Sequence, residues 1–356
     1  MTLAEARKHA RDAQAAVDRG DDPGAPHHGR EMVDTFDALA DLYLKRYSRP
    51  NKRTWATDER LLKRDIRPII GHLPIDRITR SDVLATLDKV ASRNAPIQTE
   101  RVYETIRGVF RWGLSEDYIK NDPTFGMKRR SKKQPRERVL TDAEITKLWH
   151  GLDKTTLDPR SICALKLTLA TGQRIGEICG AEISEFDTLR KTWSLPGRRT
   201  KNAKPHELPL SPLAIELVED AMVRFAGDHF LFASTPRNRV ERGNEEQPLQ
   251  ASSVSKAFAR VRDRMGLGGE PVTPHDFRRT VATFMQRSGV SEAVVARILN
   301  HRSETTRTVT AAVYMQHAFT EEKKEAIRLW DEHLRALTNE QPTHVVTRLH
   351  NNARSK

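Results

Sequence analysis

The sequence has few cysteines and no long apolar run, and each lack excludes a class of protein. Only two of its 356 residues are cysteine, Cys163 and Cys179, which is too few for a disulfide framework or a cysteine-rich metal site. No apolar run reaches the roughly 18 residues that a membrane-spanning helix needs. The N-terminal sequence MTLAEARKHARDAQ is charged throughout and lacks the apolar centre of a signal peptide. These features predict a soluble cytoplasmic protein.

Acidic residues are also in deficit. Asp and Glu number 48 against 61 Lys and Arg, a formal net charge of +13, which predicts a polyanionic partner such as nucleic acid or an acidic membrane. Residues 34–133 hold 22 basic and 14 acidic residues, an excess of 8, so more than half of the net charge lies there. Composition alone does not choose between the two partners.

Helical periodicity and breaker clusters divide the chain into five segments and predict a mainly α fold. In order, they are a short helix and its exit at 1–33, a small all-helical unit at 34–125, a basic linker at 126–138, a mostly helical unit with one small antiparallel sheet at 139–337, and a mobile tail at 338–356.

Helix-start signals and strand patterns locate the elements of the two larger units. Thr35, Ser81 and Thr141 are predicted N-caps, and Ser211-Pro212 has the N-cap, first-turn order. The predicted strands are 183–186, 192–195 and 206–210, and the predicted helices are 3–19, one from about 35, 54–68, 81–93, 98–117, one from 141, 159–171, one from 174, one from 211, 252–265, 274–288, 291–300 and 321–337.

The linker contains the run KRRSKKQPRER, residues 128–138, with seven basic residues and one acid. It is either a solvated charged connection or a strap that lies along DNA phosphates. The basic residues that would contact phosphates are Lys128, Arg129, Arg130, Lys132, Lys133, Arg136 and Arg138.

Two motifs in the unit at 139–337 place cations where an anion could bind. In ATGQRIGE, Arg174 falls in the first turn of a helix, where the dipole disfavours a cation. It is either aimed at an anion or paired with Glu177. In the polar turn RRTKNAKPH, Lys201 and Lys204 could reach into a groove or could simply keep a hairpin soluble.

Three further motifs carry groups suited to proton transfer or nucleophilic attack. In TPHDFRRT, His275 and Arg278 lie three residues apart on one helix face. A histidine that can move a proton beside a fixed cation suits phosphate chemistry, but the motif is equally compatible with a structural helix cap. His301 follows the end of a helix in LNH. Tyr314 stands in AVY, and this motif alone favours a buried packing role for the tyrosine.

Taken in order, the Arg, Lys, His-x-x-Arg, His and Tyr motifs resemble those of the tyrosine recombinase (phage integrase) family. TGQRIGE, TKNAKPHELPLS, TPHDFRRT, LNH and AVY are similar to prophage and genomic-island integrases. The resemblance covers a core-binding (SAM-like) DNA-binding domain at 34–125 and a catalytic domain with the DNA breaking-rejoining fold at 139–337. Residues 1–33 match only the last helix of an N-terminal arm-binding domain, so this domain is expected to be a remnant.

The resemblance implies cleavage and rejoining of DNA through a 3′-phosphotyrosyl intermediate, with Tyr314 as nucleophile. Arg174 and Arg278 would clamp the phosphate, with Glu177 orienting Arg174, and His275 would accept or relay the tyrosine proton.

The remaining roles implied by the resemblance fall on a lysine and a second histidine. Lys201 would protonate the leaving 5′-oxygen, with Lys204 as its rival, and His301 would hydrogen-bond the phosphate. These cations would make a metal ion unnecessary, so neither a metal nor a cofactor is expected.

The same resemblance implies partners. They are double-stranded DNA attachment sites, a homotetramer on DNA, and host factors such as a DNA-bending protein and an excision factor, in a nucleoid-associated cytoplasmic location. No membrane partner is expected. The apolar face of the last helix, formed by Ile327, Trp330, Leu334 and Leu337, would dock on a neighbouring protomer or pack on its own domain.

The sequence leaves three alternative functions open. A type IB topoisomerase-like enzyme would use the same chemistry to relax DNA, and a non-catalytic DNA-binding remnant of a decayed prophage would use none of it. A metal-dependent nuclease is less compatible with the sequence, because His27, His28, His275 and His301 show no ligand spacing.

Overall fold

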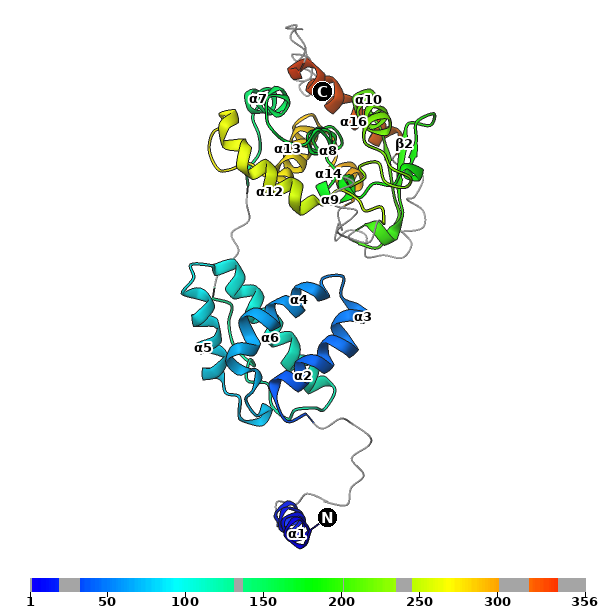
Figure 1. Ribbon diagram of the computed structural model, residues 1–356. Helices are drawn as coiled ribbons and strands as arrows, with labels where there is room; N and C mark the ends of the chain where they lie inside the picture. Colours follow the sequence, from blue (N-terminus) through cyan, green and yellow to red (C-terminus); the bar gives the residue numbers. More distant parts are fainter. Residues whose placement is uncertain are drawn as a thin grey trace, which may run out of the picture. The chain divides into compact units, whose positions relative to one another are not determined.

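The computed structural model describes residues 2–18, 33–130, 137–200, 202–234, 245–300 and 320–338. The chain forms two compact units, Met1–Pro135 and Arg136–Lys356 (Figure 1). None of the described helices is long and apolar enough to cross a membrane.

The first unit is helical in all its described elements, and its core contains Phe36, Tyr43, Ile66 and Phe110. These elements are α1 (Leu3–Asp18), α2 (Phe36–Tyr43), the π-helix η1 (Leu44–Ser48), α3 (Arg49–Asn51), α4 (Trp55–Leu61), the π-helix η2 (Leu62–Gly71), the 3₁₀ turn η3 (Ile75–Arg77), α5 (Arg80–Ala91) and α6 (Pro96–Ser115).

Two details of the first unit differ from the prediction. The helix predicted at 54–68 widens into η2, which contains Pro68; a proline ring crowds the carbonyl four residues earlier, and a π turn relieves this. The N-cap of α5 is Thr79 and not Ser81. Thr79 and Asp82 cap each other reciprocally, with the Thr79 N–H donating to the Asp82 carboxylate at 2.8 Å.

The second unit is mostly helical around one large apolar core. Its elements are α7 (Asp142–Asp153), α8 (Pro159–Thr171), α9 (Ile175–Cys179), η4 (Ile183–Glu185), β1 (Phe186–Asp187), β2 (Thr192–Leu195), η5 (Gly197–Arg199), β3 (His206–Pro209), α10 (Pro212–Arg224), α12 (Ala251–Val261), η6 (Arg262–Met265), α13 (Pro274–Arg287), α14 (Glu292–Ile298) and α16 (Thr320–Thr338).

The sheet is antiparallel in the order β1-β2-β3, with Phe186 opposite Trp193 and Leu195 opposite His206. The strand predicted at 183–186 is instead the 3₁₀ turn η4 followed by a strand of two residues. Buried Glu185 ends this turn, where its carboxylate accepts the Trp193 indole N–H at 3.0 Å. A mainly helical fold with one small antiparallel sheet confirms the predicted fold class.

Helix α16 packs on its own unit. Ile327, Trp330 and Leu334 are buried in the core, and the Trp330 indole N–H donates to the Leu169 carbonyl of α8 at 3.0 Å. Of the two expectations for this helix, docking on a neighbour or on its own domain, the structure therefore has the second.

The chain before residues 131–136 is held in the first unit, and the chain after them is held in the second. The Arg130 N–H donates to Glu100 at 2.8 Å in the first unit, and the Leu140 N–H donates to the Thr280 hydroxyl at 3.0 Å in the second. Of the predicted linker residues, Lys132, Lys133 and Arg136 lie outside the described part of the chain.

Candidate active site

The turn between α8 and α9 presents Arg174. Helix α8 ends at Gly172, whose φ of +66° is a left-handed conformation that glycine adopts most easily. An added Cβ there would also lie 3.0 Å from the Val281 side chain on α13. The chain can therefore reverse within two residues, which makes Arg174 the N-cap residue of α9.

Arg174 is held by the carboxylate three residues later. The Arg174 backbone N–H donates to Glu177 at 3.2 Å, and its guanidinium Nη1 donates to the same carboxylate at 2.7 Å. Glu177 is nearly buried, with 6% of its side chain exposed, whereas 25% of Arg174 is exposed. Within the described part of the chain the Arg174 guanidinium bonds to Glu177 alone, so most of its five N–H donors remain for a ligand.

Arg278 on α13 is buried, with an exposed fraction of 2%. Its Nη1 donates to the Gly172 carbonyl at 3.1 Å and its Nη2 donates to the Leu299 carbonyl. Its Nε–H has no hydrogen-bond partner among the described residues. Burial, reinforced by the charge of Arg174, lowers the pKa of Arg278 to about 9, which still leaves it cationic at neutral pH. A buried cation with unused donors is suited to binding an anion.

The first turn of α13 presents His275. Thr273 caps the helix and Asp276 returns the bond, with its carboxylate accepting the Thr273 N–H at 2.8 Å. His275 is exposed at the second helical position. Partial burial of the ring, together with the positive charges of Arg279 and Arg278, lowers the pKa of His275 below its ordinary value. A neutral imidazole that can accept a proton is therefore favoured at this position.

Arg174, His275 and Arg278 come together at one place in the second unit. Figure 1 shows α8, α9, α13 and α14 side by side. The charge of Arg174 is close enough to lower the pKa of both His275 and Arg278. Lys201, His301 and Tyr314 lie outside the described residues.

The loop between β2 and β3 reaches the same region. The Asn202 amide donates to the Asn300 side-chain oxygen at 2.5 Å, next to His301 in the chain. Arg199 donates to the Glu177 carbonyl at 2.6 Å, so the loop is also tied to α9. Lys204 is exposed, and its backbone N–H bonds to Asn202 at 3.2 Å. The loop that carries both lysines is thereby anchored beside the arginines.

Sequence reasoning gave no role to Gln173 and His206, two buried polar residues beside this cluster. Gln173 lies in the motif TGQRIGE and His206 in the motif TKNAKPHELPLS. Neither motif indicates which group would accept a hydrogen bond from these side chains. The structure supplies one for both, the carbonyl of Ile298, at 2.9 Å from Gln173 Nε2 and 3.1 Å from His206 Nε2.

The described linker arginines are paired with acidic residues. Arg129 contacts Glu104 at 2.6 Å. Arg130 contacts Asp88 at 2.5 Å. Arg138 is 12% exposed and donates to Glu144 and to the carbonyls of Val139, Gly268 and Glu270. The Arg138 guanidinium is thus occupied within the second unit, which differs from its expected place on DNA.

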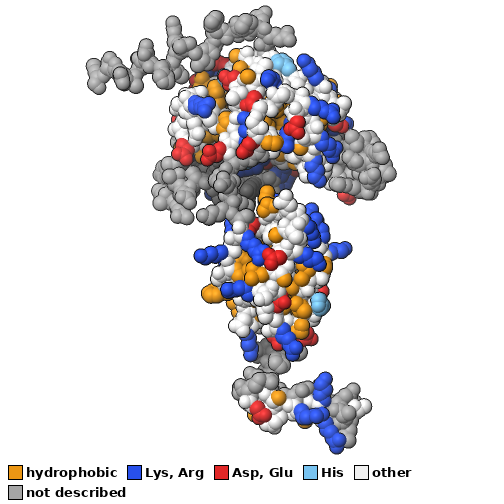
Figure 2. Space-filling view, turned by 90° about the vertical axis from the view of Figure 1, so that its left-hand side faces the viewer, with side chains coloured by type: hydrophobic (Ala, Val, Ile, Leu, Met, Phe, Trp, Pro, Cys, Tyr) orange, Lys and Arg blue, Asp and Glu red, His pale blue; other side chains and the backbone are white. Residues whose placement is uncertain are grey.

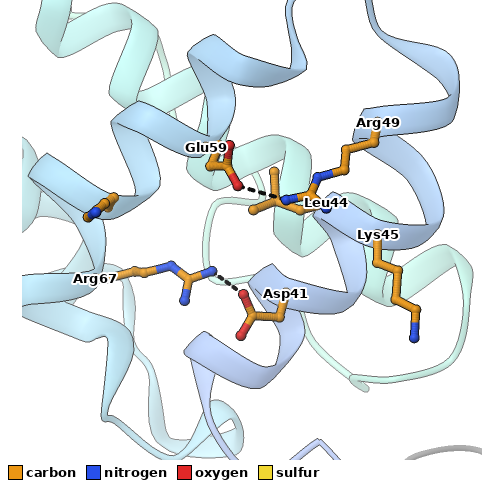
Figure 3. A pocket seen from close by; sticks show the side chains of 7 residues that line it. Asp41, Leu44, Lys45, Arg49, Glu59 and Arg67 are labelled. Carbon is orange, nitrogen blue, oxygen red and sulfur yellow. Dashed lines mark hydrogen bonds and ion pairs between the residues drawn. The ribbon is translucent and has the colours of Figure 1, made fainter. Parts of the chain in front are cut away.

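The first unit has a basic hollow of about 590 Å³, lined by residues of α2, η1, α3, α4 and η2. Figure 3 shows two ion pairs within it, Arg49 with Glu59 at 2.8 Å and Arg67 with Asp41 at 2.5 Å. Lys45 and Lys63 line the same hollow and make up its surplus of positive charge. Figure 2 shows further Lys and Arg side chains on the visible faces of both units.

Residues 138–321, which contain the whole arginine and histidine cluster, match the phage integrase family. The chain belongs to this family. A second match places the phage integrase central domain at residues 36–130. The chain is therefore an enzyme of the tyrosine recombinase family, whose activity is site-specific DNA recombination, and the resemblance drawn from the motifs is confirmed.

Relatives and solved structures of phage integrases agree with these matches. Prophage integrase IntA of Escherichia coli K12 is 23% identical over 348 residues, covering 94% of this chain and 80% of the relative. The integrase of Escherichia phage lambda is 26% identical over 246 residues, covering 67% and 65%. A lambda integrase tetramer bound to a Holliday junction has a TM-score of 0.61 at 21% identity, covering 84% of this chain and 88% of that one.

Proposed function

We propose that this chain integrates or excises a prophage or genomic island by cutting and rejoining DNA at attachment sites. The observation that carries the proposal is the cluster of Arg174 and Arg278, two cations with spare N–H donors, beside His275. In this proposal residues 139–337 are the catalytic domain and 34–125 the core-binding domain.

The proposed reaction is two successive phosphoryl transfers. The oxygen of Tyr314 attacks the scissile phosphorus, forming a 3′-phosphotyrosyl bond while the bond to the 5′-oxygen breaks. The freed 5′-hydroxyl of a partner strand then attacks the same phosphorus and releases the tyrosine. One phosphodiester is exchanged for another of similar energy, so no nucleotide hydrolysis is needed.

Arg174 and Arg278 are proposed to stabilise the extra negative charge on the non-bridging oxygens in both steps. Guanidinium groups held by Glu177 and by two backbone carbonyls are already oriented before DNA binds. His301 is proposed to add a hydrogen bond to the same phosphate.

His275 is proposed to accept the tyrosine proton, which predicts a particular pH dependence. Its pKa is lowered from 6.5, so the neutral, accepting form is lost only as pH falls below that value. We expect the single-turnover cleavage rate to be flat from pH 7 to 8 and to fall on the acid side of pH 6.5. His275→Gln should slow cleavage about 100-fold and remove this acid limb. An unchanged acid limb in the variant would show that another group titrates.

Lys201 is proposed to protonate the leaving 5′-oxygen. Lys201→Ala should slow cleavage of ordinary DNA by about 100-fold or more. A substrate with a 5′-bridging sulfur should restore the rate, since sulfur leaves without a proton. Lys204→Ala is the matched control on the same loop and should act equally on both substrates. Selective rescue of Lys204→Ala would transfer the role to Lys204.

Double-stranded DNA and a homotetramer are the proposed partners, with a host DNA-bending protein and an excision factor as accessories. Support comes from two structures of lambda integrase, a dimer bound to a core site and a tetramer bound to a Holliday junction. Lys45, Lys63 and the linker residues Lys128, Arg129, Arg130, Lys132, Lys133 and Arg136 are proposed to contact phosphates. Arg138 is left out because its side chain is only 12% exposed and is engaged by Glu144, whereas 59% of the Arg129 side chain and 34% of the Arg130 side chain is exposed.

A nicked duplex tests the function. The probe covers the junction formed when the genetic element that carries the gene circularises, with the nick placed so that the cleaved fragment diffuses away. We expect a covalent protein–DNA adduct, in EDTA as well as in Mg²⁺, and strand exchange with an intact partner duplex. Adduct without strand exchange would indicate topoisomerase-like relaxation. Cleavage only with Mg²⁺ would indicate a nuclease, and binding without adduct a non-catalytic remnant.

A further inference from the structure

Three side chains from separate segments close the C-terminal end of α14. The Ile298 carbonyl accepts Gln173 Nε2–H at 2.9 Å and His206 Nε2–H at 3.1 Å, and the Leu299 carbonyl accepts Arg278 Nη2–H. The last carbonyls of a helix have no partner within the helix. Here the two carbonyls accept hydrogen bonds from Gln173 in the α8–α9 turn, His206 on β3 and Arg278 on α13. Three separate elements therefore hold the end of α14.

His206 is a permanent neutral donor. A carbonyl oxygen only accepts, so the His206 Nε2 must carry a proton. Burial lowers the pKa of His206 to about 4, and the nearby charges of Lys323, Arg278 and Arg174 act in the same direction. Lys323 of α16 is itself held by the Glu207 carbonyl at 3.0 Å. The ring is therefore neutral at physiological pH and cannot serve as the proton carrier of the reaction.

The residue after this closed end adopts a left-handed backbone conformation. Asn300 has a φ of +48°, which glycine and asparagine adopt more readily than other residues. Its side-chain oxygen accepts the Asn202 amide of the β2–β3 loop at 2.5 Å. Contacts from three separate segments thus hold residues 298–300 in place.

We propose that His206 and Gln173 are positioning residues for the phosphate site. By holding the Ile298 carbonyl they fix the neighbouring Leu299 carbonyl that orients Arg278. This inference rests on the proposed function of Arg278. A shift of about 1 Å at a reacting group costs about 100-fold in rate, so loss of a positioning bond should be visible in catalysis.

The test compares variants that differ in the hydrogen bond alone. His206→Phe keeps an aromatic ring but cannot donate, whereas the Nε2 of His206→Gln reaches a similar position and can. We expect His206→Phe to slow single-turnover cleavage about 10- to 100-fold with the Kd for the same duplex changed less than about threefold. His206→Gln should stay within about fivefold of the wild type. His229→Phe, an exposed histidine of the same unit, is the matched control and should have no effect.

Two readouts separate positioning from a general structural role. The rate ratio of wild type to His206→Phe should be the same at pH 6 and pH 8, because neutral His206 does not titrate there. The effect of His206→Phe should also shrink in an Arg278→Lys background, because His206 acts through Arg278. A slow His206→Gln variant, a parallel loss of DNA affinity or full additivity with Arg278→Lys would overturn the proposal.

An activity-independent measurement keeps this inference distinct from the proposed function. Hydrogen–deuterium exchange of the DNA-free protein should show faster exchange in a peptide covering residues 295–300 for His206→Phe, but not for His206→Gln. If the wild type forms no adduct, the proposed function fails, yet this exchange result still reports on the closed end of α14. Unchanged exchange in His206→Phe would contradict the positioning role in either case.

Discussion

Tyr314→Phe is expected to form no covalent adduct with the nicked duplex and to lose recombination by at least about 10⁴-fold. Phenylalanine keeps the ring but removes the oxygen that forms the bond to phosphorus. None of the other proposed groups can replace that oxygen while leaving a 3′-phosphotyrosyl link. The measurement is denaturing electrophoresis of the protein with end-labelled DNA after a single turnover.

The matched control for this variant is Tyr47→Phe. Tyr47 is 39% exposed in the first unit and packs on the ring of Tyr43, and we have given it no role in the reaction. It should form adduct at the wild-type rate. Adduct that persists in Tyr314→Phe would mean that another residue is the nucleophile.

Arg278→Lys is expected to reduce cleavage about 10²- to 10³-fold, the usual effect of removing one donor to a developing oxyanion. Lysine keeps the charge, but its three N–H donors share one nitrogen, whereas Arg278 uses separate nitrogens for the carbonyls of Gly172 and Leu299. A lysine therefore cannot reproduce the spread of the guanidinium donors toward both carbonyls and a phosphate. Arg278→Ala should be worse, because it removes the charge and also leaves two buried carbonyls without a donor, at a cost of about 1–3 kcal/mol each in folding stability.

The measurement for Arg278 is the single-turnover rate at saturating DNA, together with the Tm of each variant. Arg335→Lys is the matched control. Arg335 on α16 pairs with Glu216 at 2.7 Å and with Asp331 at 3.1 Å, away from the cluster, so its loss should leave the rate unchanged. A wild-type rate in Arg278→Lys would remove this residue from the proposed clamp.

Local signals in the sequence predicted much of the fold. The reciprocal cap of Thr141 and Glu144 starts α7, and Ser211-Pro212 starts α10, as their residue types require. The segment Thr79 to Asp82 was harder, because it offers two hydroxyl residues at almost the same place. Only the reciprocal bond with Asp82 selects Thr79 over Ser81.

In the candidate site, too, contacts between residues close in the chain were predictable and contacts between distant residues were not. Arg174 and Glu177 are three residues apart, and their pairing follows from helix geometry. The acceptors of Gln173 and His206 lie 125 and 92 residues away in the chain. No periodicity carries that information, so two buried polar side chains in recognised motifs received no role until the fold placed α14 beside them.

The most direct test of the account is to map the residue that becomes attached to DNA. The adduct formed by the wild-type protein on the nicked duplex in EDTA would be digested with protease and nuclease, and the modified peptide identified by mass spectrometry. We expect one modified residue, Tyr314, linked to a nucleotide 3′-phosphate. A nucleotide on any other residue, or a 5′-phosphate linkage, would contradict it.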